Sequence, residues 1–126
     1  MSIRTPLARV RGLGSAKSGV SHWWGQRVSA IALVPLSIWF VASVVALIGA
    51  EHGATRAWIG SPLAAGLTIL LVVATFYHAY LGLQVVIEDY IHHEGAKFAM
   101  LLSVQAATIV LALAGVLSVL SLLFTG

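Results

Sequence analysis

The sequence predicts an all-α membrane protein with three transmembrane helices. Hydrophobic residues make up 60% of the 126 residues and charged residues only 9%, whereas a soluble domain carries about a quarter charged residues. Such a chain has too few polar side chains to cover a surface that faces water, and too much apolar material to be disordered. Cysteine is absent, which excludes disulfides, thiolate metal sites and iron–sulfur ligation within this chain.

Three stretches contain no Asp, Glu, Lys or Arg: residues 28–48, about 63–87 and 98–124. Each has at least the ~20 residues that a helix needs to cross a ~30 Å hydrocarbon core. Helices are expected because backbone groups in lipid must bond within the chain. Pro35 predicts a slight bend in the first span. A cleaved signal peptide is the alternative interpretation of that span, but its uncharged run is longer than the roughly 7–15 residues typical of one.

The basic residues predict how the chain is oriented. We expect a cytoplasmic tail over residues 1–27 and a three-helix anchor domain over residues 28–126. Three spans place this tail and the connector between the second and third spans on one side, which then holds six of the seven Lys and Arg residues. The positive-inside rule predicts a bacterial inner-membrane protein with a cytoplasmic N-terminus and a periplasmic C-terminus. The charge of +3 thus describes a tail, and no nucleic-acid partner is expected.

His78 is the most informative residue of the second span. It lies ten residues before Glu88, about 15 Å below the cytoplasmic end of its helix. Ionisable groups at that depth are costly and usually functional. We interpret His78 as an axial ligand of haem iron, which needs a neutral imidazole in a dry pocket. The alternative is a neutral histidine hydrogen-bonded to a neighbouring helix. Gly82, one turn on, leaves room on the same face for a flat macrocycle, and Ala74 does so one turn before.

The other four histidines lie outside the spans. His22 and His52 flank the first span, and His92 and His93 follow the second. A six-coordinate haem would therefore take its second ligand from another chain, so we expect the haem at a subunit interface. The connector of His92, His93 and Glu94 is interpreted as a solvated loop rather than a metal site. Gly95 within it predicts the end of a helix.

Polar residues at the ends of the spans are further candidates. Asp89 continues the stripe of His78 at i+11, about 20° off the same line, and Tyr90 adds a phenol at the membrane surface. Arg27 begins the first span. It is either an anchor that reaches the lipid headgroups or a partner for a haem propionate or a quinone-site carboxylate.

The third span has neither a charge nor a histidine, and we expect it to serve packing. Small side chains let helix backbones approach closely in lipid. Such side chains recur at helical spacing along this span, at Ala107, Ala114, Ser118 and Ser121.

Two segments resemble a known family. Residues 21–30, SHWWGQRVSA, preceded by GLGSAK at residues 12–17, resemble the N-terminal signature of succinate dehydrogenase hydrophobic membrane anchor subunits. Residues 78–90, HAYLGLQVVIEDY, resemble the second-helix signature of that family. The pattern of His, Gly, Asp and Tyr is specific because it fixes unusual polar residues within one membrane helix. The resemblance covers roughly residues 10–95, and the length and span order extend it over the whole chain.

The resemblance implies a place in respiratory complex II. There the anchor and a cytochrome b subunit form the membrane domain of a heteromeric helix bundle. They hold a flavoprotein subunit, which carries FAD, and an iron–sulfur subunit, which carries the clusters, at the cytoplasmic face. Electrons from succinate pass through these groups to ubiquinone, and haem b sits between the two anchor chains. No catalytic residue is expected in this chain alone.

The resemblance also implies roles for individual residues. His78 is expected as the haem ligand, Arg27 near a haem propionate, and Tyr90 as hydrogen-bond donor to a quinone carbonyl. Asp89 is expected to support that tyrosine or the proton path. Two alternatives remain open at this point: the anchor of a quinol:fumarate reductase, and a purely structural tether without a cofactor.

Overall fold

The computed structural model describes residues 16–125, which form four helices. Three of these helices are long and apolar enough to cross a membrane: α2, α4 and α5. No strand occurs in the described residues, so the predicted all-α membrane fold is confirmed. The helices are α2 (Ala16–Ala46), α3 (His52–Ile59), α4 (Pro62–Tyr90) and α5 (Glu94–Thr125).

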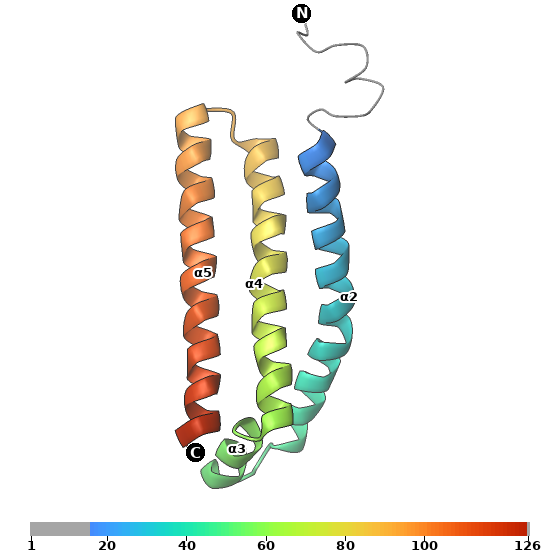
Figure 1. Cartoon of the computed structure of the whole chain (residues 1–126), viewed down its shortest axis with the longest axis vertical. Helices are drawn as coiled ribbons and strands as arrows, with labels where there is room; N and C mark the ends of the chain where they lie inside the picture. Colours follow the sequence, from blue (N-terminus) through green and yellow to red (C-terminus); the bar gives the residue numbers. More distant parts are fainter. Residues whose placement is uncertain (1–15, 126) are drawn as a thin grey trace, which may run out of the picture.

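The three long helices lie side by side with α4 in the middle (Figure 1). Among the described residues, α2 and α5 each pack against α4 and do not contact each other. The start of α2 and the connector between α4 and α5 lie at one end of this layer, and α3 and the end of α5 lie at the other (Figure 1). This agrees with the predicted three-span topology. A layer one helix thick leaves both of its faces open.

Helix α2 begins earlier than the charge-free stretch suggested. It starts at Ala16, well before Val28, so Trp23, Trp24 and Arg27 lie on the helix. Tryptophan and arginine suit the membrane–water boundary because their polar tips reach water while their apolar bodies stay in lipid. Arg27 therefore suits the boundary of the lipid, but the helix continues on both sides of it. The part of the predicted tail before Ala16 lies outside the described residues.

The connector between α2 and α4 holds a short helix, α3, that the sequence analysis did not predict. Gly49 turns the chain after α2 with a φ of 83°, a conformation that side chains other than glycine rarely adopt. The rings of Trp58 on α3 and Trp39 on α2 lie 5.7 Å apart. Pro62 then occupies the first turn of α4, where its missing N–H costs nothing.

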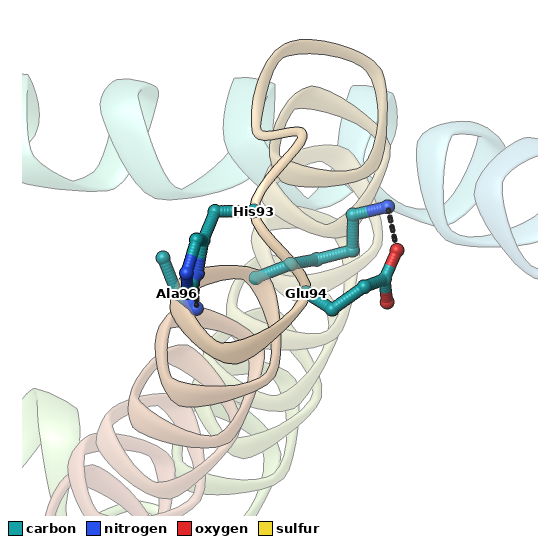
Figure 2. A network of polar contacts seen from close by, with 4 residues as sticks. His93, Glu94 and Ala96 are labelled. Atoms are coloured by element: carbon teal, nitrogen blue, oxygen red, sulfur yellow. Dashed lines mark hydrogen bonds and ion pairs between the residues drawn. The ribbon is translucent and has the colours of Figure 1, made fainter.

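His93 caps the start of α5 (Figure 2). Its Nδ1 accepts a hydrogen bond from the backbone N–H of Ala96 at 3.0 Å. Lys97 and Glu94 form an ion pair at 3.7 Å on the same turn. Gly95 was expected to end a helix and instead lies in the first turn of α5, so that prediction was wrong. The helix that precedes it ends at Tyr90.

The third span packs through residues other than the predicted stripe. Gly115 faces Val72 of α4, and a Cβ on this glycine would lie 3.0 Å from Val72 Cγ1. Val119 is the buried residue of α5. The stripe lies about a quarter turn away from this contact, so its members are exposed in this chain: Ala107, Ala114, Ser118 and Ser121.

Gly60 provides a test of how α3 is held in place. A Cβ at this position would lie 2.9 Å from the backbone carbonyl oxygen of Leu122 on α5. Backbone cannot yield as a flexible side chain does, so we expect Gly60→Ala to destabilise the protein by about 1–3 kcal/mol. The readout is the thermal unfolding midpoint of the protein purified with its partner subunits in detergent. Gly53→Ala, on the same short helix with no atom within 4 Å, is the matched control and should leave the midpoint unchanged or higher. Equal midpoints for the two variants would contradict the tight contact.

Candidate functional site

Three polar side chains of α2 face α4. His22, Gln26 and Ser29 recur at i, i+4 and i+7, which places them on one face of the helix. The Nε2–H of His22 donates to the backbone carbonyl of Leu81 at 3.0 Å. Together with His78 of α4, these three residues form what we call the polar seam. Its α2 residues lie within the candidate span Gly19–Ala46, which begins earlier than the predicted one, and unpaired polar groups are expensive in lipid.

The central contact of the polar seam joins Ser29 to His78. Ser29 Oγ lies 2.9 Å from His78 Nδ1 and donates its own hydrogen to the carbonyl of Gln26 at 3.1 Å. A hydroxyl has one hydrogen to give. In this arrangement Ser29 accepts from the Nδ1–H of His78, which leaves Nε2 as the second ring nitrogen. That nitrogen makes no hydrogen bond within the described residues.

The backbone at Gly82 leaves open space next to the polar seam. A Cβ added there would meet a single neighbour within 4 Å, the Nε2 of Gln26 at 3.7 Å. The Oε1 of that same amide is buried and has no partner among the described residues. A buried acceptor without a donor calls for a group that the chain itself does not supply. His78 and Gly82 are thus brought together, as predicted, on one face of α4.

Arg27 does not join this group. It lies about 100° around α2 from Gln26 and about 200° from Ser29, so it points away from α4. Its side chain is exposed, and its guanidinium carbon lies 5.1 Å from the ring centroid of Trp23, in a cation–π contact. Within this chain the arginine is separate from His78.

Asp89 and Tyr90 form a second location at the end of α4. Both side chains are exposed, and Tyr90 is 75% accessible. Twelve residues of helix separate Tyr90 from His78, which is about 18 Å along the axis. The residues predicted for haem and for quinone therefore lie at two levels along one helix.

Comparison with known proteins decides the family. Residues 1–114 match the model of a family described as succinate dehydrogenase/fumarate reductase transmembrane subunit. The chain belongs to this family.

Individual relatives agree with the family match. The chain is 32% identical over 116 residues to a succinate dehydrogenase hydrophobic membrane anchor subunit of Rickettsia bellii (strain RML369-C), covering 92% of this chain and 93% of the relative. It is 36% identical over 100 residues to the subunit of the same description from Paracoccus denitrificans, covering 79% and 78%. A succinate dehydrogenase membrane anchor subunit of Reclinomonas americana is 28% identical, covering 74% and 80%.

The protein is therefore a multi-pass membrane anchor subunit of the succinate dehydrogenase type, and it works as part of a complex with partner subunits. Within its described residues, no three His, Cys, Asp or Glu side chains come together to hold a metal ion. A haem needs only one axial ligand from a given chain, so the lone His78 is the residue of this anchor to consider.

An apolar groove runs between α2 and α4 on the other side of the polar seam. Its volume is about 500 Å³, and Ser29, Ala74 and Tyr77 are among its lining residues. Ala74, which was expected to leave room for a macrocycle, lines that groove, whereas His78, Gly82, Arg27, Asp89 and Tyr90 do not. Tyr77 and Gly82 lie about 140° apart around α4. The polar seam therefore lies between the groove and the open space next to the backbone of Gly82.

The sequence analysis missed three residues of the polar seam as site residues. Gln26 and Ser29 entered only as letters of the signature, and His22 only as a residue that flanks a span. The signal that could have found them is their recurrence at i, i+4 and i+7 on an otherwise apolar helix. The partner of that face could not be read from the sequence, because it depends on which side of α4 the helix packs.

Proposed function

We propose that this anchor subunit supplies one axial ligand of a haem b that it shares with the cytochrome b subunit of succinate dehydrogenase. The observation that carries the proposal is the hydrogen bonding of the two ring nitrogens of His78. Its Nδ1 is engaged by Ser29, and its Nε2 is free within the described residues. Haem ligation requires this neutral imidazole with one nitrogen held and the other available.

The surroundings of His78 fit the group. Gly82 presents bare backbone on the same face of α4, so a flat macrocycle meets no side chain there. The second ligand comes from the partner chain, since the other four histidines lie at or beyond the ends of the long spans. Haem b, when bound, would supply a reversible one-electron store.

We further propose that Tyr90 and Asp89 form part of the ubiquinone reduction site. Reducing a quinone to a quinol takes two electrons and two protons, and the electrons come from the iron–sulfur subunit. The exposed phenol of Tyr90 donates a hydrogen bond to a quinone carbonyl, and the neighbouring carboxylate of Asp89 passes protons from water. Arg27, on the outer face of α2, is available to a propionate or to a group of the partner chains.

The proposed setting is the bacterial inner membrane, with the N-terminus in the cytoplasm and the C-terminus in the periplasm. Lys17 in the first turn of α2 and Lys97 in the first turn of α5 lie at one end of the layer, whereas Arg56 on α3 lies at the other, which supports this orientation. The flavoprotein and iron–sulfur subunits would then dock at the end that carries Tyr90. The complex oxidises succinate in the citric acid cycle and passes electrons to the respiratory chain.

The haem proposal is tested by visible spectroscopy of the intact complex. The reduced-minus-oxidised spectrum of the wild-type complex is expected to show haem b, and His78→Ala is expected to remove or change it. His92→Ala, in the exposed connector, is the matched control and should leave the spectrum as it is. An unchanged spectrum in His78→Ala excludes ligation. A wild-type complex without haem, at full assembly, favours the structural tether.

A further inference from the structure

We infer that Ser29 is the positioning residue of the haem ligand: its hydroxyl holds the ring of His78 in one tautomer and one orientation toward the iron. The inference rests on the proposed function, since it assumes that His78 binds haem. Ser29 lies on α2 and His78 on α4, so this contact makes α2 part of the haem site.

The direction of the hydrogen bonds carries the argument. Ser29 Oγ donates to the Gln26 carbonyl at 3.1 Å, which uses its single hydrogen. The 2.9 Å contact with His78 Nδ1 then requires the hydrogen to be on the imidazole. The ring is thereby fixed with its lone pair on Nε2, the nitrogen left free to bind iron. The tautomer that a ligand needs is set within the chain itself.

Burial makes this contact persistent. Ser29 is only 5% exposed and is one of two buried polar residues among those described. No water competes for the hydroxyl in such a place, and it accepts from no other side chain of the described residues. A hydrogen bond in a dry site is electrostatically stronger than one in water. The ring of His78 consequently has one favoured plane.

The contact also affects the iron. A hydrogen bond accepted from the Nδ1–H of a ligating histidine fixes its orientation and raises its basicity as a ligand. A more basic ligand stabilises ferric over ferrous iron. Loss of the Ser29 hydroxyl is therefore expected to move the haem midpoint potential in the positive direction. Without this hydroxyl the imidazole ring is free to rotate. The electron paramagnetic resonance signal of a low-spin ferric haem depends on the orientation of that ring.

The experiment compares three variants of the intact complex by redox titration of the haem and by electron paramagnetic resonance. Ser29→Ala should show the more positive potential and a shifted or broadened low-spin signal. Ser29→Thr keeps the hydroxyl and should return both toward wild type. Ser43→Ala is the matched control, because Ser43 on the same helix also bonds a helix carbonyl, Trp39 O at 2.8 Å, but faces no histidine.

The outcomes distinguish the role of Ser29 from the proposal that His78 binds haem. Wild-type potential and signal in Ser29→Ala, in a complex whose haem is lost in His78→Ala, would overturn the role of Ser29 and leave haem ligation standing. A shift of equal size in Ser43→Ala would overturn it as well. If Ser29→Ala fails to assemble, Ser29→Cys replaces it, since a thiol is a weak acceptor of similar size. That variant should shift in the same direction, and a wild-type result again contradicts the inference.

Discussion

Replacing Tyr90 with phenylalanine is expected to lower succinate–ubiquinone reductase activity about tenfold. The phenol is exposed at the end of α4 and lies about 18 Å along the axis from His78, the proposed haem ligand. A hydrogen bond to a substrate is worth about 1.5 kcal/mol, and this corresponds to about one order of magnitude in rate. Succinate oxidation with a soluble artificial electron acceptor should be nearly unchanged, because the proposed role of Tyr90 begins only at the quinone.

Tyr80→Phe is the matched control for this experiment. Tyr80 lies on the same helix but deeper, half-buried against a groove that α4 and α5 line. Its replacement should leave both activities close to wild type. Equal loss of quinone-linked and artificial-acceptor activity in Tyr90→Phe would count against a role in the quinone site and would indicate faulty assembly.

Replacing Gly82 with leucine is expected to yield an assembled complex that has lost most of its haem. This chain tolerates a side chain there, since one atom alone, Gln26 Nε2, comes within 4 Å of the added Cβ. A macrocycle bound to His78 would meet the new side chain directly. Overpacking of a filled site costs about 1–3 kcal/mol, so the affinity for haem falls about tenfold or more. The readout is the ratio of haem to flavin in the purified complex.

Two further variants make the Gly82 experiment specific. Gly66→Leu places the same side chain on the same helix at an open position with no atom within 4 Å, and the haem ratio should stay at its wild-type value. Gly82→Ala should give an intermediate ratio. Full haem content in Gly82→Leu would place the macrocycle away from this face of α4.

The position of each residue along its helix could be predicted from the sequence. The direction in which its side chain points could not. Long uncharged stretches located the three spans, and the spacing along α4 placed His78 and Tyr90 at different levels. The direction in which Arg27 points depends on the angle at which α2 meets α4. For the same reason the sequence could not show that the small-residue stripe of α5 faces away from α4. Hydrophobic patterns cannot identify the packing face of a helix that is apolar all round.

Local chemistry explains the remaining differences. The short helix α3 is too polar to resemble a span and too short to show a clear period, so the connector was not recognised as helical. Gly95 looked like a helix end because glycine commonly follows one. In the structure His93 caps α5 instead, with its ring nitrogen accepting from Ala96. Histidine is outside the usual set of capping residues, so no general rule would have chosen it.

The position of α4 between two helices that do not meet has a mechanical consequence. Within the described part of the chain, α2 and α5 are linked along most of their length only through α4, the helix that carries His78, and at one end of the layer also through α3. A partner that docks against α5 would therefore displace the imidazole relative to Ser29, whereas one that docks on the outer side of α2 would press the serine toward it. The distance between His78 and Ser29 is therefore expected to change when a partner binds on either side of the subunit.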